Sequence, residues 1–356
     1  MKTNGSPQTG NAHLAAESGA TPARRIALLF PGQGSQRAGM GKRIAEVSQA
    51  ARGVFDKADE VLGFRLSRLC FEGSAEELED TANAQPAILT TSMAHLAYLR
   101  ERVQEVGRRL RPSFVAGHSV GQFTAAITAN ALDFADGLRL VLERGRIMAE
   151  WARTRPGGLV AILGLSEPAV HQVCRDASPK GEVGVAVING PGHTIISGRS
   201  EALQRATVLA RERGARLVRR LPISTPGHTP LMRDAADQLA GFIDKVSFRD
   251  PDPPLVSNIS ARVLKSAEEV RQELSDQICV AVQWARCVVT MADAGVDTFV
   301  ELGPGNALSK MVRRLSKDVE TISTEDASPE ALLSLTEALP AVLPAGTSRA
   351  GLAEAV

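Results

Sequence analysis

The order of strand-like and helix-like segments constrains the fold of this chain more than any other feature of its sequence. Short apolar runs at residues 25–30 and 113–117 are each followed by helical periodicity, which is typical of a parallel sheet covered on both faces. Between about residues 157 and 222 the order changes to strand, helix, strand, strand, helix, strand, with a turn at residues 189–192 joining the middle strands. After this segment the first pattern resumes.

This change of pattern predicts two domains, one inserted into the other. The six-element segment has the ferredoxin-like order, so we expect a small ferredoxin-like domain at residues 153–222. Residues 25–152 and 223–317 are expected to form one large α/β domain, and the cleft between two such domains is a favoured ligand site. Residues 1–24 are expected to be a disordered leader, and residues 318–356 a C-terminal tail that serves as a docking helix or a linker.

Composition and charge argue against several classes of function. The formal net charge is +1, so no overall field favours nucleic acid or an anionic membrane as a partner. The longest apolar stretches fall well short of the roughly 20 residues that a membrane-spanning helix needs. The N-terminal segment lacks the basic and apolar regions of a signal peptide, and we therefore expect a cytoplasmic protein.

Neither the cysteines nor the histidines are spaced as metal ligands. The 4 cysteines are scattered without a CxxC pair, and in a cytoplasmic chain they are expected to be reduced. The 6 histidines form neither an HExxH motif nor a cluster with cysteine. No metal site is therefore predicted.

The segment Gly-His-Ser-Val-Gly at residues 117–121 carries the clearest chemical motif. It fits GxSxG, follows a predicted strand and opens a predicted helix, which is the context of a nucleophile elbow. In such an elbow the hydroxyl of Ser119 is exposed on a sharp turn, and the helix N-terminus places free N–H groups beside it. A chance pentapeptide in a strand–helix turn is the alternative interpretation.

A nucleophilic serine needs a base, and His228 is the strongest candidate. It ends the segment Ser-Thr-Pro-Gly-His at residues 224–228, where the Pro-Gly pair favours a rigid approach of the chain. The sequence leaves open that it is an ordinary loop histidine. His118 adjoins the serine but is expected to point elsewhere, and the remaining histidines are assigned to the leader, to helix faces or to turns.

An oxyanion hole is expected from the backbone N–H of Val120 and a second N–H in the Gly-rich turn at residues 31–36. An ordinary Gly-rich loop is the alternative for this turn. It is not a dinucleotide-binding fingerprint, because Arg37 occupies the third glycine position of GxGxxG. The loop at residues 303–305 lacks the GK[ST] ending of a Walker motif.

Seven segments occur in the order in which one enzyme family has them. They are FPGQGSQ (30–36), NAQPA (83–87), GHSVG (117–121), RGRIM (144–148), STPGH (224–228), VQW (282–284) and ELGPG (301–305). On these segments, which cover about residues 26–315, the chain resembles the malonyl-CoA:acyl-carrier-protein transacylases, including the free-standing, trans-acting acyltransferases of polyketide synthases. The resemblance implies an α/β-hydrolase-like core with an inserted ferredoxin-like small domain.

The resemblance also implies a reaction. Malonyl, or an alkyl-substituted malonyl such as ethylmalonyl, would pass from coenzyme A to the phosphopantetheine thiol of an acyl carrier protein. The transfer would be ping-pong, through an ester on Ser119, in polyketide or fatty-acid biosynthesis. The implied partners are an acyl-CoA donor and a phosphopantetheinylated carrier protein. Coenzyme A enters as a thioester substrate, and no cofactor is implied.

The catalytic residues that the resemblance implies agree with those found from the motifs. Ser119 matches the acylated serine and His228 its base. Gln277 matches a glutamine whose backbone carbonyl orients that histidine. The two N–H groups of the oxyanion hole are assigned to Gln33 and Val120.

Four residues are implied to bind the substrate. Arg144 matches an arginine that clamps the free carboxylate of malonyl through two parallel hydrogen bonds, and without the family it would be taken for a helix-surface arginine. Gly227 leaves room for an α-substituent, as in family members that use ethylmalonyl, whereas Val120 resembles malonyl-selective members. Met148 and Gln85 belong to matching segments and are implied to bind the substrate too.

Several alternatives remain open at this stage. Gln122 stands where many family members have Glu, which removes a charge near the site. Arginine clusters at residues 108–111, 219–220 and 313–314 would dock an acidic carrier protein or the phosphates of coenzyme A, or would simply be solvated faces. The rival functions are an acyl hydrolase that clears stalled acyl groups from carrier proteins and a non-catalytic docking subunit.

Overall fold

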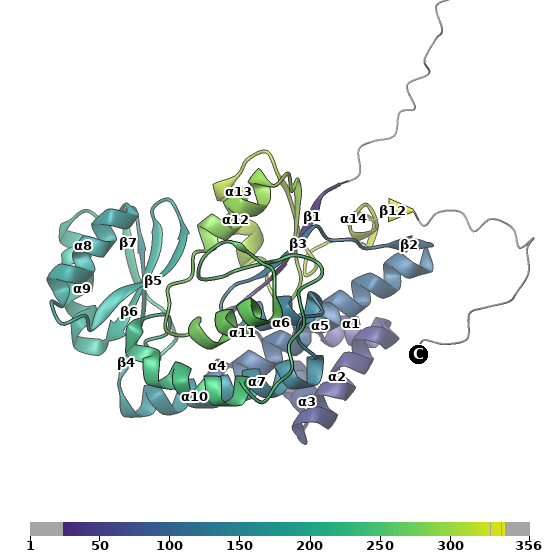
Figure 1. The fold of residues 1–356 in the computed structure, drawn as a ribbon, viewed down its shortest axis with the longest axis horizontal. Coiled ribbons are helices and arrows are strands. Elements are labelled where there is room, and N and C mark those ends of the chain that lie inside the picture. The colour runs from purple at the N-terminus through teal and green to yellow at the C-terminus, as the bar shows by residue number, and fades with distance from the viewer. Residues whose placement is uncertain (1–23, 328, 336, 339–356) are drawn as a thin grey trace, which may run out of the picture.

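The structure, a computed structural model, describes residues 24–327, 329–335 and 337–338. Its largest sheet consists of β1 (Ile26–Phe30), β3 (Phe114–Gly117), β8 (Leu255–Val256), β9 (Val263–Leu264), β10 (Thr298–Glu301) and β11 (Glu320–Ser323). The strand order is β11-β10-β1-β3-β8-β9. β1 and β3, which are labelled in Figure 1, are the two central strands. All neighbouring strands are parallel except β8 and β9.

Helices cover both faces of this sheet, as the alternating pattern predicts. In β1, Ile26, Leu28 and Phe30 belong to one buried cluster, whereas Ala27 and Leu29 belong to a second cluster on the opposite face. The second cluster includes α12 (Trp284–Asp293) and α13 (Ala307–Leu315). The first includes a 3₁₀ turn at Pro230–Met232 and α1 (Lys42–Val47), α2 (Gln49–Leu62), α3 (Leu66–Glu72), α4 (Ala75–Glu79), α5 (Thr81–Glu105), α6 (Gly121–Thr128), α7 (Phe134–Thr154), α10 (Arg233–Ile243) and α11 (Ala267–Asp276).

The inserted segment forms the small ferredoxin-like domain that its pattern predicts. It comprises β4 (Gly157–Leu163), α8 (Glu167–Ala177), β5 (Val183–Gly190), β6 (His193–Arg199), α9 (Ser200–Glu212) and β7 (Leu217–Arg220). The strands make one antiparallel sheet in the order β5-β6-β4-β7. One face packs against α8 and α9, and the other brings Leu159, Ala161 and Val187 into the cluster that contains Trp284 of α12. This contact joins the two domains.

The large sheet extends further toward the C-terminus than expected. β11 pairs in parallel with β10, so residues 320–323 belong to the large sheet and the boundary at residue 317 is too early. The segment Glu-Thr-Ile-Ser carries a single large apolar side chain, too few for a recognisable strand pattern. Beyond it, α14 (Pro329–Leu333) and β12 (Glu337–Ala338) follow, and β12 pairs with β2 (Arg108–Arg109). Except for Arg24, the expected leader lies outside the described residues, as does the tail beyond residue 338.

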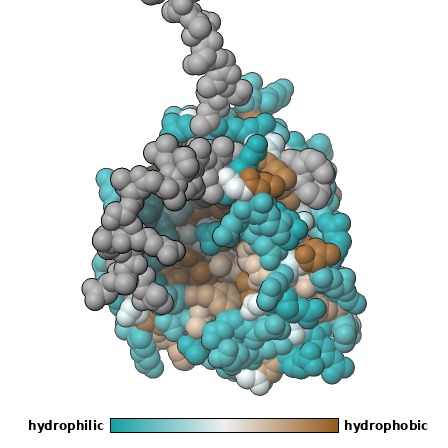
Figure 2. Space-filling model, turned by 90° about the vertical axis from the view of Figure 1, so that its right-hand side faces the viewer, coloured by the Kyte–Doolittle hydropathy of each residue, from teal (hydrophilic) through white to brown (hydrophobic). Residues whose placement is uncertain are grey.

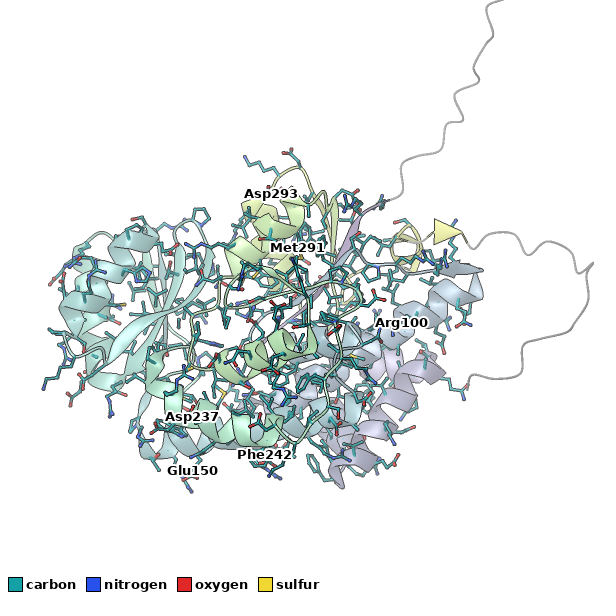
Figure 3. The ribbon with its side chains drawn as sticks, in the orientation of Figure 1. Arg100, Glu150, Asp237, Phe242, Met291 and Asp293 are labelled. Carbon is teal, nitrogen blue, oxygen red and sulfur yellow. The ribbon has the colours of Figure 1, made fainter. Side chains whose placement is uncertain are left out.

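The exposed positions of the helices are largely polar, although a few carry apolar side chains, among them Phe242 of α10 and Val289 of α12. On α12, Met291 is fully buried whereas Asp293 is exposed (Figure 3). On the side of the molecule shown in Figure 2, the visible hydrophobic residues lie between hydrophilic ones. In the part of the chain that the structure describes, no helix is both long enough and apolar enough to cross a membrane.

Candidate active site

Ser119 lies at the elbow that the GxSxG motif predicts. β3 ends at Gly117, α6 begins at Gly121, and between them Ser119 has a φ of 53°. This left-handed conformation is strained for a residue other than glycine, and such strain clusters at functional turns. Both flanking glycines are required, because a Cβ on Gly117 would collide with the carbonyl group of Gly121, and one on Gly121 with that of Phe30.

His228 lies within hydrogen-bond distance of this serine, where a base would be needed. Its Nε2 lies 2.8 Å from Oγ of Ser119, and its Nδ1 lies 2.7 Å from the backbone oxygen of Gln277. Because a carbonyl oxygen only accepts, Nδ1 carries the proton and Nε2 is free to accept the serine proton. Burial, with the charge of Arg144 second, lowers the pKa of His228 to about 3, so the imidazole is neutral at neutral pH.

The turn after β1 lies against the elbow, as an oxyanion hole requires. A Cβ on Gly32 would collide with the carbonyl oxygen of His118, so only a glycine allows this approach. The side chain of the next residue, Gln33, donates to Oγ1 of Thr81 at 3.0 Å. Among the hydrogen bonds of the described residues, none uses the backbone N–H of Gln33 or Val120, so both groups are available to an oxyanion.

Arg144 reaches the same site from α7, although only 1% of its surface is exposed. Its Nη1 donates to Oε1 of Gln85 at 2.6 Å, and its Nη2 donates to Oε1 of Gln277 at 3.0 Å and to Oγ of Ser119 at 3.4 Å. Burial lowers the pKa of Arg144 to about 9, which still leaves a cation at neutral pH. Because these partners are neutral, the guanidinium is suited to bind an anion beside the nucleophile.

The other two residues that the sequence analysis assigned to substrate binding, Met148 and Gly227, lie beside one another. Met148 follows Arg144 by one helical turn, and its sulfur accepts a hydrogen bond from Nε2 of Gln85 at 3.4 Å. Among the described residues, and apart from its two chain neighbours, a Cβ on Gly227 would meet only Cε of Met148 within 4 Å, at 3.5 Å. The space beside Gly227 is therefore bordered by a flexible side chain that can move aside.

A cleft of about 420 Å³ opens beside the elbow, between the two domains. Gln33 and His118 line it from the large domain, and Asn189 and Arg219 from the small one. Nε2 of His118 lies 3.2 Å from Oδ1 of Asn189, and its ring packs edge-on against Trp284. His118 therefore interacts with the small domain, as its expected direction away from the nucleophile implies.

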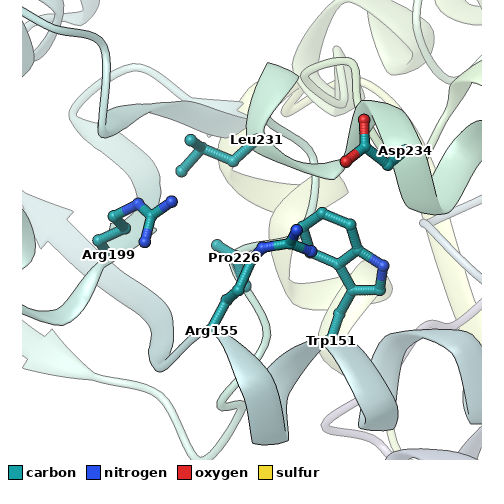
Figure 4. Close-up of a pocket in the computed structure, with 6 residues that line it drawn as sticks. All are labelled: Trp151, Arg155, Arg199, Pro226, Leu231 and Asp234. Carbon is teal, nitrogen blue, oxygen red and sulfur yellow. The ribbon is translucent and has the colours of Figure 1, made fainter.

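A smaller cavity of about 180 Å³ adjoins the loop before His228 at Pro226 (Figure 4). There the guanidinium of Arg155 lies 3.7 Å from the ring centre of Trp151, with Arg199 nearby. Its lining holds no serine, threonine or cysteine. Among the described residues, no group of three or more His, Cys, Asp or Glu side chains is arranged to hold a metal ion.

Three polar residues support the backbone of the elbow, and the sequence analysis did not assign this role to any of them. They are Asn258, Gln122 and Glu273. Asn258 accepts a hydrogen bond from the N–H of Ser119 at 2.9 Å and donates to the carbonyl oxygen of Gly117 at 2.6 Å. Gln122 accepts from the N–H of Gly117 at 2.9 Å. Both residues donate to the same carboxylate oxygen of Glu273, Asn258 through its backbone N–H and Gln122 through its side chain.

Comparison with known proteins identifies the family. The sequence model described as acyl transferase domain matches residues 27–337, most of the chain. The chain belongs to the acyl transferase family. This result confirms the resemblance found from the seven ordered segments, and it establishes the protein as an acyltransferase.

This acyltransferase aligns with individual relatives over nearly their whole length. It is 41% identical over 303 residues to the malonyl CoA-acyl carrier protein transacylase of Bacillus subtilis, covering 85% of this chain and 94% of the relative. The enzyme of the same name from Escherichia coli strain K12 is 36% identical over 291 residues, with 82% and 93% covered.

Solved structures of other proteins have the same fold as this acyltransferase. The acyl carrier protein S-malonyltransferase of Vibrio cholerae matches with a TM-score of 0.81 at 34% identity, covering 87% of this chain and 99% of the other. A malonyl-transacylase in complex with a type II polyketide synthase acyl carrier protein matches with a TM-score of 0.81 at 33% identity, covering 87% and 98%. The predicted fold class, a large α/β core with a small ferredoxin-like domain, is confirmed.

Proposed function

We propose that this acyltransferase transfers a malonyl group from coenzyme A to the phosphopantetheine thiol of an acyl carrier protein, through an ester on Ser119. The observation that carries the proposal is the position of Arg144, a buried cation with neutral partners 3.4 Å from Oγ of the nucleophile. A guanidinium in this position favours acyl groups that end in a carboxylate. The names of the relatives, which include both malonyl and carrier protein, support the same pair of substrates.

The first half-reaction follows from the geometry of the site. Nε2 of His228 takes the proton from Oγ of Ser119, and Oγ attacks the thioester carbonyl. The negative charge that develops on the carbonyl oxygen is stabilised by the N–H groups of Val120 and Gln33. The carbon–sulfur bond then breaks, the sulfur takes the proton from His228, and coenzyme A leaves as the free thiol.

The second half-reaction reverses these steps with a different thiol. The phosphopantetheine thiol gives its proton to His228, and its sulfur attacks the ester on Ser119. The oxyanion forms in the same place, the bond from carbon to Oγ breaks, and Oγ recovers the proton from the imidazolium. Gln277 keeps the histidine oriented through both halves, because its backbone carbonyl accepts from Nδ1 at 2.7 Å.

An alkyl-substituted malonyl such as ethylmalonyl also fits this proposal. Arg144 would bind the carboxylate that all malonyl thioesters share, and the space beside Gly227 would take the α-substituent. Cε of Met148 borders that space, 3.5 Å from a Cβ at residue 227. Fatty-acid or polyketide biosynthesis would supply the carrier protein. The cytoplasmic location, and the lack of nucleic-acid and membrane partners, stay predictions.

Two rival functions fit the site less well. An acyl hydrolase would use the same serine and histidine, but clearing uncharged acyl groups gives no use for a buried cation at Arg144. A non-catalytic docking subunit would need no hydrogen bond of 2.8 Å between Ser119 and His228. Both features are accounted for when a carboxylate-bearing acyl group is transferred.

One experiment separates the three functions. The protein is incubated with malonyl-CoA, a phosphopantetheinylated carrier protein is then added, and the intact mass of both proteins is followed. Transfer predicts a malonyl adduct that persists on the enzyme and moves to the carrier protein. Release of free malonate before the carrier protein is added would favour the hydrolase, and no adduct on either protein would favour the docking subunit.

A further inference from the structure

Glu273 on α11 is a buried acid that the mechanism above does not use. Only 3% of its surface is exposed. Its Oε1 accepts from the backbone N–H of Asn258 at 2.5 Å and from Nε2 of Gln122 at 3.4 Å, and its Oε2 accepts from Oγ of Ser257 at 2.6 Å. All three donors are neutral. An acid buried without a cation is costly, so its position calls for a physical reason.

Both Asn258 and Gln122 hold the backbone of the elbow. The amide of Asn258 bridges the turn, accepting from the N–H of Ser119 at 2.9 Å and donating to the carbonyl oxygen of Gly117 at 2.6 Å. Gln122 accepts from the N–H of Gly117 at 2.9 Å. Three backbone groups around the nucleophile are therefore tied to two side chains, and these two residues meet at the carboxylate of Glu273.

This arrangement explains how the strained turn is maintained. Ser119 has a φ of 53°, and a residue stays in such a conformation only where its surroundings hold it there. If the bonds from Asn258 and Gln122 loosened, the turn would relax and Oγ would move away from Nε2 of His228. Small displacements of a reacting group are costly, since about 1 Å can lower a rate by about 100-fold.

We propose that Glu273 is a positioning residue for Ser119, acting through Asn258 and Gln122 to keep Oγ within hydrogen-bond distance of His228. The inference rests on the proposed function only in taking Ser119 as the nucleophile. It does not depend on which acyl group is transferred.

The test uses a reagent that reports on the nucleophile and not on the acyl pocket. A neutral fluorophosphonate reacts with an activated serine: Oγ bonds to phosphorus, fluoride leaves, and His228 takes the hydroxyl proton. The rate of labelling is measured by intact mass for the full-length wild type and for Glu273→Ala and Glu273→Gln. Glu268→Ala is the matched control, because Glu268 lies on the same helix with 75% of its side chain exposed.

We expect Glu273→Ala to label at least about tenfold more slowly than wild type, consistent with the cost of a displaced reacting group. KM for malonyl-CoA should stay within about twofold, because Arg144 and the cleft are untouched. Glu273→Gln, which offers one acceptor oxygen in place of two, should be intermediate. Glu268→Ala should label as wild type does.

Labelling of folded Glu273→Ala within about twofold of wild type would overturn the inference, as would a change confined to KM. If Glu273→Ala does not fold, Glu273→Gln decides, and a wild-type rate in that variant would also overturn it. Failure of the proposed function is distinguished by the wild type, which would then label at Ser119 but accept no malonyl group.

Discussion

The guanidinium of Arg144 lies 3.4 Å from Oγ of Ser119, although the two residues are brought together from different elements of the large domain. The same guanidinium donates to the side chain of Gln277, whose backbone carbonyl orients His228. Ser119, His228 and Arg144 therefore share one hydrogen-bonded cluster. Each of these residues has a different proposed role, so substitutions at different positions should alter selectivity, protonation or rate.

Arg144→Ala should remove the preference for acyl groups that carry a carboxylate. A charge-assisted hydrogen bond is worth about 1.5–3 kcal/mol, so kcat/KM for malonyl-CoA should fall by at least about tenfold, while acetyl-CoA gains relative to it. Arg146→Ala is the control, since Arg146 is exposed on the same helix and pairs with Glu143. An unchanged malonyl-to-acetyl ratio in Arg144→Ala would rule out the clamp and favour the hydrolase.

His228 should remain a neutral imidazole from pH 5 to pH 8. Its pKa is lowered to about 3, mainly by burial, so the protonated form is lost well below this range. An ordinary histidine, with a pKa of about 6.5, would pass from mostly charged to mostly neutral over the same range. NMR of the ring nitrogens checks this, with His228→Gln assigning the resonance. We expect the proton on Nδ1 throughout, and a titration midpoint between pH 6 and 7 would contradict the account.

His228→Ala should slow malonyl loading by about 10²–10⁴-fold, the range that general bases contribute. Loading is followed by the growth of the adduct mass over time. His118→Ala is the comparison, because His118 interacts with Asn189 and Trp284 and not with the nucleophile. If the loss in His228→Ala were smaller than about tenfold, another group would have to be the base.

Gly227→Phe should distinguish malonyl from its larger analogues. A phenyl ring at this position would occupy the space beside Met148, so ethylmalonyl transfer should fall more than malonyl transfer. One methylene is worth about 1–3 kcal/mol of discrimination, so a shift in preference is expected and not an absolute switch. Gly227→Ala is the control, because its Cβ would make only an ordinary contact at 3.5 Å. Equal losses for both substrates in Gly227→Phe would show that Gly227 only spaces the His228 loop.

Ser119 and His228, the proposed nucleophile and base, were chosen from local patterns. GxSxG after a strand is a local motif, and both glycines are fixed by close contacts of neighbouring backbone. The roles of Gln277 and Arg144 came only with the family resemblance, because each reaches the site through contacts between elements far apart in the sequence. Periodicity places Arg144 on the same helix face as Val141 and Met148, but it does not say which groups the guanidinium contacts.

Glu273 illustrates what local patterns leave out. It shares the buried face of α11 with Val270 and Leu274, so an acid among apolar positions was a visible anomaly. Its proposed role depends on its contacts with Asn258 and Gln122, which lie in other parts of the sequence. The structure also gives Gln122 a role that the sequence left without an account, as a side chain that holds the backbone of Gly117.

The central claim is that malonyl is carried as an ester on Ser119. The most direct measurement is to incubate wild type and Ser119→Ala with malonyl-CoA, quench in acid and locate the adduct by peptide mass mapping. The account predicts one malonyl group on the peptide containing Ser119 in wild type, and none in a folded Ser119→Ala. A malonyl adduct on Ser119→Ala, or on another residue of wild type, would contradict it.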